Sequence, residues 1–470
     1  MNINKLVRPN IANLKPYQCA RYNNASGILL NANENPYGRL NRYPDPLCKD
    51  LKKALADYAE TNEKNIFVGN GSDEIIDLLI RAFCDPGKDN IFIKRPSYGM
   101  YEVAAAINNI EVSDEINEYT KLIFLCSPNN PSGEILSEEE VLRFCENECL
   151  VVLDEAYIEF SSSSSMALKR GNLVVLRTLS KAWGGAGIRL GYSLSNEQIV
   201  KTLNKIKFPY NVNVLTQKKA AEILKNPERM RRQVKMILEE RARVKDRLEG
   251  LGLKVWDSRA NFLLFEVGGA SNVQKKLESF GLVLRDRSSD YENALRVTIG
   301  TKKENNEFLK ALEKCLVKVA FLDRDGVLIY EPQDDFQVDS LKKYKILDGV
   351  KDGLRELVKS GYKLVMITNQ DGMGSGHFPE KDFLLVQNQF LRDVGVKFDE
   401  VFVCTHFAEE SCNCRKPKTG MVDDFLNSNP LNMKESFVVG DRDTDMEFAR
   451  NIGVKGFKQT TNNKFVTPKL

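Results

Sequence analysis

The sequence predicts an α/β protein of two or three domains, and three observations support this prediction. The chain has 470 residues, which is more than one compact domain usually holds. Hydrophobic residues make up 42% of the chain and charged residues 28%, as in ordinary globular proteins. Short apolar runs alternate with helical patterns, which is typical of parallel strands that are buried on both faces.

The first half of the chain contains a helical pattern and several buried strands. Apolar residues recur at helical spacing over residues 73–84, which are followed by the turn at 85–87. A charged segment at 226–250 carries an apolar stripe with interleaved Glu, so we expect a solvated helix rather than an RNA-binding surface. The serine run at 161–165 is expected to be a surface loop. The expected strands are 91–93, 122–125, 150–153 and 173–176.

A second α/β domain is expected after residue 316. Residues 301–316 form a helical pattern with Thr301 and Glu304 in capping-box spacing, and a new apolar strand follows at 317–322. The alternation of strands and helices then begins again. Its expected helices are 350–359 and 445–452, and its expected strands are 363–368, 400–404 and 436–440. We therefore predict a boundary between domains at 1–316 and 317–470.

Charge and apolar patterning exclude several classes of protein. The formal net charge is only +3, so no overall field would attract the chain to nucleic acid or to an anionic membrane. The first residues lack a signal-peptide core, and no run of about 18 apolar residues is present. We expect a cytoplasmic protein with reduced thiols, no membrane and no nucleic-acid partner.

Four segments between residues 70 and 192 carry the groups of a cofactor site. Ser72 lies at the start of a helix, where free backbone N–H groups can hold a phosphate. Ser180 and Arg189 flank a glycine-rich loop and can add a hydroxyl donor and a cation. Lys181 can bond covalently to a carbonyl group, and Asp154 can stabilise a protonated ring nitrogen. Each signal alone is weak, because a Lys after Ser is usually a surface residue.

The order of these motifs resembles fold-type I pyridoxal-phosphate (PLP) aminotransferases. The motifs are Asn-Pro-Ser-Gly at 130–133, Asp-Glu-Ala-Tyr at 154–157 and Ser-Lys-Ala at 180–182. Further segments are similar to those of histidinol-phosphate aminotransferases, at 31–37, 42–45, 96–101 and 295–300. The resemblance covers about the first 315 residues. It implies a large lobe at about 41–210 and a small lobe in the remainder of the domain.

The resemblance also implies residue roles. Lys181 would be the Schiff-base lysine and proton shuttle, and Asp154 would face the pyridinium nitrogen. Arg296 would hold the donor carboxylate or the substrate phosphate, with Tyr17 and Arg285 as weaker candidates. The other cofactor-binding residues would be Asn130 and Tyr157 at the phenolic oxygen, Tyr98 on the ring, and Ser72, Ser180, Arg189 and a second subunit's Tyr43 at the phosphate. The role of Tyr43 implies a homodimer.

Polar residues follow several strands of the C-terminal domain. The strand ends of a parallel sheet converge on one crevice, so we expect these side chains to meet. Carboxylates there can hold Mg²⁺, while a lysine and a threonine neutralise and orient a phosphoryl group. An Asp-x-Asp motif alone could instead be a capped turn. The residues concerned are Asp323, Asp325, Thr368, Lys416, and Asp441 and Asp445 after what we take to be the last strand.

These elements resemble the haloacid-dehalogenase-type phosphatases, which implies a Rossmann-like domain. By this resemblance Asp323 would be the nucleophile that forms an aspartyl-phosphate, and Asp325 would be the acid and base. Mg²⁺ would be bound by Asp323, the Asp325 carbonyl and Asp441. Thr368 and Lys416 would bind the substrate. Val327 stands where many members have Thr, so one local hydrogen bond is expected to be missing.

A cysteine and histidine cluster narrows the phosphatase group. Cys404, His406, Cys412 and Cys414 supply three thiolates and one imidazole, the closed set expected of structural Zn²⁺, although unrelated free thiols are an alternative. Together with Thr-Asn-Gln-Asp-Gly at 368–372 and Cys-Arg-Lys-Pro-Lys at 414–418, this loop resembles the histidinol-phosphate phosphatases. The heptose-bisphosphate phosphatases share the zinc loop.

The two resemblances together predict a bifunctional enzyme of histidine biosynthesis. Its expected small-molecule substrates are imidazole-acetol phosphate with glutamate, forming histidinol phosphate and 2-oxoglutarate, and histidinol phosphate for hydrolysis. One alternative is another amino-acid aminotransferase fused to a sugar-phosphate phosphatase. A second alternative, that one domain is a catalytically silent scaffold, conflicts with the reactive residues that both domains carry.

Overall fold

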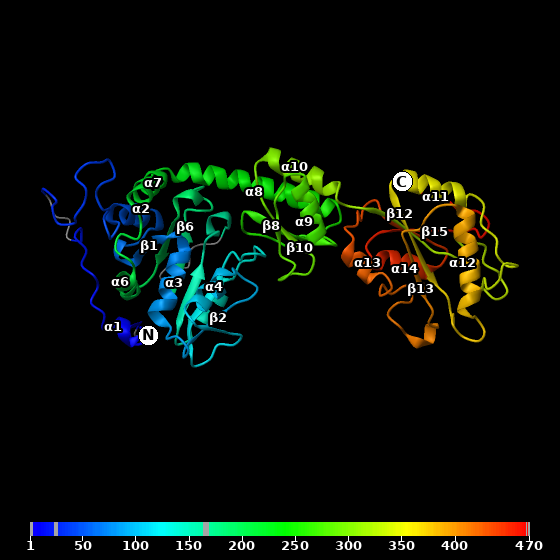
Figure 1. The fold of residues 1–470 in the computed structure, drawn as a ribbon, viewed down its shortest axis with the longest axis horizontal. Coiled ribbons are helices and arrows are strands. Elements are labelled where there is room, and N and C mark those ends of the chain that lie inside the picture. Colours follow the sequence, from blue (N-terminus) through cyan, green and yellow to red (C-terminus); the bar gives the residue numbers. More distant parts are fainter. Residues whose placement is uncertain (1–2, 23–26, 163–168, 467, 469–470) are drawn as a thin grey trace. The chain divides into compact units, whose positions relative to one another are not determined.

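The computed structural model describes residues 3–22, 27–162, 169–466 and 468, and the chain divides into two compact units (Figure 1). The first unit comprises residues up to 242 together with 256–264, and the second comprises 243–255 together with 265–470. Residues 163–165 of the predicted serine loop lie outside the described residues. In the described part of the chain, no helix combines the length and apolar composition that a membrane span requires.

A seven-stranded sheet forms the centre of the first unit, in the order β1-β7-β6-β5-β4-β2-β3. The pairs from β3 to β6 are parallel, whereas β7 is antiparallel to both of its neighbours. The four predicted strands are confirmed as β2, β4, β5 and β6, and the sequence analysis missed β1, β3 and β7. The strands are β1 (Ile66–Asn70), β2 (Asn90–Ile93), β3 (Glu111–Ser113), β4 (Thr120–Cys126), β5 (Leu150–Asp154), β6 (Leu173–Thr178) and β7 (Leu190–Leu194).

Helices cover both faces of this sheet, because successive strand residues point to opposite sides. In β5, Leu150 and Val152 join one apolar core, while Val151 and Leu153 join the other. The first core includes α3 (Gly71–Phe83), α4 (Met100–Ile107) and α6 (Glu197–Ile206). The second includes α2 (Lys49–Ala59), α5 (Glu138–Phe144), α7 (Val214–Leu224) and the first turns of α8 (Pro227–Gly250). The predicted helices at 73–84 and 226–250 are therefore confirmed as α3 and α8.

A three-stranded sheet follows along the chain, in the order β8-β10-β9. Its strands are β8 (Phe262–Glu266), β9 (Arg285–Asp286) and β10 (Ala294–Thr298), and its helices are α9 (Ala270–Ser279) and α10 (Lys302–Glu313). The predicted capping box is confirmed, because the Thr301 hydroxyl accepts from the Glu304 N–H and the Glu304 carboxylate accepts from the Thr301 N–H.

A five-stranded parallel sheet follows in the order β13-β12-β11-β14-β15. The predicted boundary at 316 and 317 falls between α10 and β11 and remains a prediction. One expectation was wrong: β14 is not the last strand, because the edge strand β15 follows it. Its sequence, Lys-Gly-Phe-Lys, contains too few apolar residues to produce a strand signal. The strands are β11 (Lys318–Leu322), β12 (Tyr362–Asn369), β13 (Glu400–Cys404), β14 (Phe437–Gly440) and β15 (Lys455–Lys458).

Helices pack on both faces of this parallel sheet. One core contains residues of α11 (Val350–Lys359) and α12 (Glu380–Val394), and the other contains residues of α13 (Asp423–Ser428) and α14 (Asp443–Asn451). The sheet is thus covered by two apolar cores, and its polar residues lie at the ends of its strands.

Candidate active sites

The first cluster of reactive residues lies where strands of the seven-stranded sheet end. Asp154 is the last residue of β5, and Lys181 follows β6 by three residues. Asp154 is buried; its Oδ2 accepts from the Tyr101 hydroxyl at 2.8 Å and its Oδ1 accepts from the Ala156 N–H at 3.0 Å. Burial raises the pKa of Asp154 to about 6, although both hydrogen bonds and the nearby Lys181 charge oppose this rise.

Asp73, in the first turn of α3, connects two of the predicted cofactor-binding residues. Its Oδ1 accepts from the Tyr98 hydroxyl at 3.2 Å, and its Oδ2 lies 3.4 Å from Nη2 of Arg189. Two glycines allow the backbone to approach closely here. A Cβ at Gly71 would lie 2.7 Å from Nη2 of Arg189, and a Cβ at Gly191 would lie 2.2 Å from the Ser72 nitrogen. Ser72, Arg189 and Tyr98 therefore surround the N-terminal end of α3.

Other predicted residues lie beside Lys181. Its Nζ is 5.3 Å from the centre of the Tyr157 ring, which is buried. The Ser180 hydroxyl accepts from the Thr178 hydroxyl at 2.9 Å. This hydrogen bond fixes the side chain of Ser180, the residue before Lys181. Asn130 is half-buried at the start of the cis Asn130–Pro131 peptide.

This arrangement fits PLP. Backbone N–H groups at a helix N-terminus with an arginine beside them suit a phosphate. A buried carboxylate near a lysine amine suits a protonated ring nitrogen and a covalently held aldehyde. The absence of a Cβ at Gly71 and at Gly191 lets the Arg189 guanidinium and the backbone of β7 lie close to this helix end.

Two of the predicted residues are exposed on the first unit, and two others belong to the second unit. Tyr17 and Tyr43 are 73% and 51% exposed, and the Tyr43 ring stacks on Tyr210 at 4.5 Å. Arg285 and Arg296 lie in the second unit, directly opposite each other on β9 and β10. Side chains of opposite residues in an antiparallel pair share a face, so this pairing places two cations together.

The second cluster lies at the strand ends of the five-stranded sheet, around a cavity of about 700 Å³. Asp323 and Asp325 follow β11, Thr368 lies near the end of β12, and Asp441 follows β14. Lys416 also lines the cavity. The structure therefore brings together all the residues that were expected to meet here, including Asp445.

Lys416 is the central cation of this cluster. Its side chain is almost completely buried, and Nζ lies 2.8 Å from Oδ1 of Asp323 and 2.6 Å from Oδ1 of Asp445. It also donates to the Ile367 carbonyl at 3.0 Å. Burial raises the pKa of Asp323, and the positive charge of Lys416 opposes this effect.

The carboxylates fit Mg²⁺. Oxygen atoms of Asp323, Asp441 and Asp445 lie within 4.8 Å of one another. Oδ1 of Asp441 is buried and has no hydrogen-bonding partner among the described residues. An all-oxygen set of this kind suits a hard divalent cation.

Two contacts of Asp325 were not predicted from the sequence. Gln370 donates from Nε2 to Oδ2 of Asp325 at 2.7 Å and to the Thr368 hydroxyl at 2.8 Å. Arg324 is fully buried, with its guanidinium 4.6 Å from the centre of the Phe383 ring and Nη1 3.5 Å from Asp325. Gln370 stands within the motif at 368–372, but a motif does not indicate which partner a side chain reaches.

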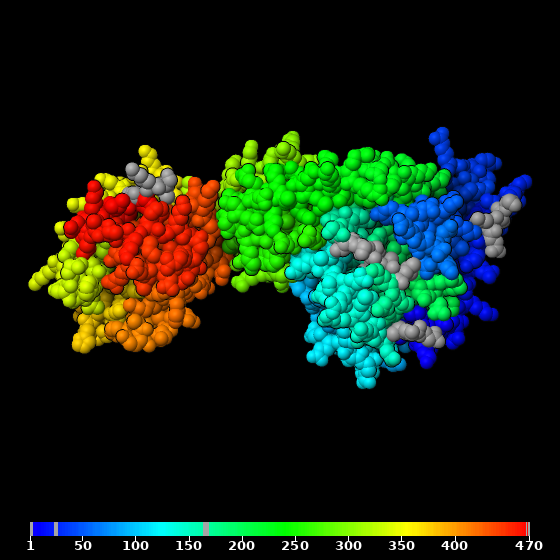
Figure 2. All heavy atoms as spheres, turned by 180° about the vertical axis from the view of Figure 1, so that it is seen from behind, coloured from blue at the N-terminus to red at the C-terminus, as the bar shows by residue number. Residues whose placement is uncertain are grey.

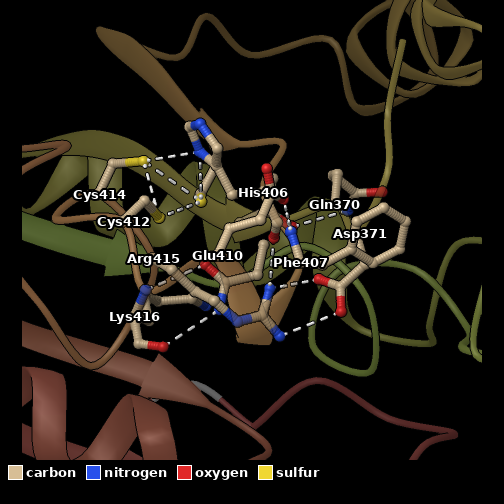
Figure 3. A network of polar contacts seen from close by, with 12 residues as sticks. Gln370, Asp371, His406, Phe407, Glu410, Cys412, Cys414, Arg415 and Lys416 are labelled. Atoms are coloured by element: carbon tan, nitrogen blue, oxygen red, sulfur yellow. Dashed lines mark hydrogen bonds and ion pairs between the residues drawn. The ribbon is translucent and has the colours of Figure 1, made fainter. Parts of the chain in front are cut away.

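The cysteine and histidine cluster forms a compact four-atom group (Figure 3). Sγ of Cys414 lies 3.4 Å from Sγ of both Cys404 and Cys412, and 3.3 Å from Nδ1 of His406. Sγ of Cys404 lies 3.7 Å from Cys412 and from His406. A tetrahedral Zn²⁺ with Zn–S bonds of about 2.3 Å has S···S edges of about 3.8 Å. The group therefore fits zinc.

The cysteine loop, residues 404–415, is bonded to the segment at 370–371 that lines the second cavity (Figure 3). Arg415 forms an ion pair with Asp371 through both carboxylate oxygens, and its Nη1 donates to the His406 carbonyl at 3.1 Å. The Gln370 N–H donates to the Cys404 carbonyl at 2.7 Å. The cysteine loop thus supports Gln370, which contacts Asp325.

Comparisons with known proteins match both parts of the chain. Residues 28–312 match the family model "Aminotransferase class I and II", and residues 318–465 match "Polynucleotide kinase 3 phosphatase". The histidinol-phosphate aminotransferase of Parabacteroides distasonis is 47% identical over 339 residues, which cover 66% of this chain and 98% of that protein. The corresponding enzyme of Christiangramia forsetii is 46% identical over 342 residues, covering 67% of this chain and 98% of that protein.

Solved structures agree with this assignment. The crystal structure of the histidinol-phosphate aminotransferase from Clostridium acetobutylicum is similar with a TM-score of 0.53 and 26% identity. The match covers 58% of this chain and 90% of that one. The fold of the N-terminal part is therefore the α/β aminotransferase fold type I. The chain belongs to the aminotransferase class I and II family, in which its N-terminal two-thirds is homologous to the histidinol-phosphate aminotransferases.

Proposed function

We propose that the chain is a bifunctional enzyme of histidine biosynthesis. The N-terminal part would transfer an amino group from glutamate to imidazole-acetol phosphate, giving 2-oxoglutarate and histidinol phosphate. The C-terminal part would hydrolyse histidinol phosphate to histidinol and inorganic phosphate. The observation that carries this proposal is the pair of separate strand-end clusters, one suited to transamination and one to phosphate-ester hydrolysis.

PLP, when bound at the first cluster, supplies an electron sink for the carbanion at the substrate α-carbon. Lys181 would hold the cofactor and carry the proton from the substrate α-carbon. The ionised Asp154 carboxylate would face the ring nitrogen. The remaining contacts would come from Tyr98 on the ring, from Asn130 and Tyr157 at the phenolic oxygen, and from Ser72, Ser180 and Arg189 at the phosphate.

Arg296 and Arg285 would bind the anionic end of the substrate. Their opposite positions on β10 and β9 would let both cations bind one anion. The donor carboxylate and the substrate phosphate are both such anions, and Tyr17 is a further candidate for this pocket.

The aminotransferase part would form a homodimer. Tyr43 would complete the phosphate site of the partner subunit from its exposed position on the first unit. Near it in the sequence, Ile28, Leu30, Tyr37 and Leu40 are between 64% and 90% exposed. They belong to the N-terminal segment that is blue in Figure 2, and a second copy would cover their apolar side chains.

In the phosphatase part, Asp323 would attack phosphorus. Lys416 and the Arg324 N–H both contact Oδ1 of Asp323, so Oδ2 is the oxygen that we propose as nucleophile. The P–O bond to the alcohol breaks as the new O–P bond forms, and Asp325 gives the leaving oxygen its proton. Asp325 then takes a proton from the water that hydrolyses the aspartyl-phosphate. Mg²⁺ would be held by Asp323, Asp441 and the Asp325 carbonyl, and Thr368 would orient the phosphoryl group.

The charge of the cavity favours histidinol phosphate over a polynucleotide, the substrate in the matching family's name. Acidic residues outnumber basic ones among its lining residues; they include Glu331, Asp335 and Asp371 away from the reacting group. A polyanionic backbone is repelled by such a lining. Histidinol phosphate instead carries an ammonium group at the end opposite its phosphate.

The cysteine loop would bind structural Zn²⁺ and stabilise the loop that carries Gln370 and Asp371. The other seven cysteines are buried and free, which suits the reducing cytoplasm in which we expect the protein.

Two variants of the full chain test the proposal. We expect Lys181→Ala to abolish glutamate-dependent 2-oxoglutarate formation and leave phosphate release from histidinol phosphate unchanged, and Asp323→Asn to do the reverse. Failure of the wild type to release phosphate at millimolar histidinol phosphate would refute the assignment of the second site. A heptose bisphosphate and a 3′-phosphorylated oligonucleotide serve as competing substrates in the same assay.

A further inference from the structure

One buried hydroxyl near the first site has a contact that the proposed reaction does not yet use. Tyr101 lies in α4 and is completely buried, and its hydroxyl donates to Oδ2 of Asp154 at 2.8 Å. Its ring is stacked on Phe124, with ring centres 4.8 Å apart and planes at 20°. Its ring also meets Tyr98 edge to face at 5.6 Å. Packing from two sides therefore fixes the direction in which the hydroxyl points.

Asp154 depends on few groups to remain ionised in this environment. Among the residues that the structure describes, the Tyr101 hydroxyl and the Ala156 N–H donate to it, one at each oxygen. The charge of Lys181 favours the ionised form, and the charge of Asp73 opposes it. The Cys126 thiol contacts the Tyr101 hydroxyl, and burial raises the pKa of this thiol, which keeps it neutral. An ionised carboxylate in a buried site is stabilised chiefly by such donors.

We propose that Tyr101 is a positioning residue for transamination, which orients the Asp154 carboxylate toward the ring nitrogen of the cofactor and keeps it ionised. This inference rests on the proposed role of Asp154. Tyr101 would act only through the two site residues that it contacts directly, Asp154 and Tyr98. A protonated or rotated Asp154 would no longer favour the protonated form of the ring nitrogen.

The substitution Tyr101→Phe removes the donor while retaining the ring. A hydrogen bond to a charged group contributes about 1.5–3 kcal/mol, which corresponds to about a 10- to 150-fold change in an equilibrium. We expect PLP affinity of the apo-protein to fall by about fivefold or more at pH 6 and by about twofold at pH 7, because the pKa of Asp154 is about 6 before the substitution. The pH below which affinity declines should rise by about one unit, because Asp154 takes up a proton more readily without the donor.

Tyr192→Phe is the matched control. Tyr192 is equally buried in β7 of the same sheet, but its hydroxyl lies near Arg177 and Glu159 instead of Asp154. This control should leave the pH dependence of PLP binding as in the wild type. Phosphate release should be unchanged in both variants, which shows that the second site remains folded.

The test measures PLP binding to the full-length apo-protein by absorbance between pH 6 and 8.5, together with the kcat of transamination. The inference is overturned if Tyr101→Phe retains the wild-type affinity and pH profile. If Tyr101→Phe fails to fold, 3-fluorotyrosine at position 101, a stronger donor, should move the profile to lower pH; an unmoved profile also overturns the inference. A wild type that binds no PLP would refute the proposed function instead.

Discussion

The substitution Lys416→Met tests whether one lysine neutralises the acidic cluster of the phosphatase site. Nζ lies within 2.8 Å of both Asp323 and Asp445, and the side chain is almost fully buried. Methionine retains most of the apolar stem but leaves the two carboxylates without their cation. Breaking a buried ion pair by removing one partner costs about 3–5 kcal/mol. At about 2–4 °C per kcal/mol, the melting temperature should fall by about 6–20 °C.

The assay is differential scanning calorimetry of the full chain at pH 7.5, with and without Mg²⁺. Magnesium should recover part of the loss, because a divalent cation near Asp323 and Asp441 also offsets their charge. Lys458→Met is the control, since Lys458 forms a solvent-exposed pair with Asp443 at 2.7 Å and such pairs contribute little. The reasoning is refuted if Lys416→Met lowers the melting temperature no more than Lys458→Met does.

Three further predictions concern other parts of the chain. Cys414→Ser should lower the zinc content measured by atomic absorption and reduce phosphate release, whereas Cys145→Ser, outside the cluster, should leave both unchanged. Gly191→Ala should weaken PLP binding by about tenfold, because its Cβ would meet the backbone of α3 and overpacking costs about 1–3 kcal/mol; unchanged binding would contradict the close approach. Burial lowers the pKa of Lys52 to about 8 from its usual 10.5, so folding releases its proton and the free energy of unfolding should rise between pH 8 and 10.5. Urea unfolding should show this rise in the wild type and in Lys53→Met but not in Lys52→Met, and a persistent rise in Lys52→Met would assign it to another group.

The elements that the sequence predicted best are those in which local pattern and burial agree. The helix at 350–359 and the strand at 400–404 have the predicted bounds, and α10 begins at its predicted capping box. Two of the strands that were missed, β1 and β8, carry buried apolar runs that were not assigned. Others lack such a pattern. β7 contains Gly191 and Ser193 and pairs antiparallel with both neighbours, which is a tertiary property. β15 is an exposed edge strand with a single apolar residue.

The residues of the two sites could be found in the sequence because each follows a strand in a recognisable motif. The hydrogen-bond and ion-pair partners of these residues could not be predicted from the sequence. The bond from Tyr101 to Asp154 joins residues 53 positions apart, and the bond from Gln370 to Asp325 joins residues 45 positions apart. Which donor reaches which carboxylate depends on how helices and loops pack against the sheets. The same is true of Lys416, whose second partner, Asp445, follows from the position of α14.

The most direct test of the central claim is a coupled assay on the purified full chain. Imidazole-acetol phosphate and glutamate are supplied with PLP and Mg²⁺, and 2-oxoglutarate and inorganic phosphate are measured over time. We expect phosphate to appear after a lag and to approach the amount of 2-oxoglutarate formed. Formation of 2-oxoglutarate without phosphate would contradict the claim that the second site consumes the product of the first.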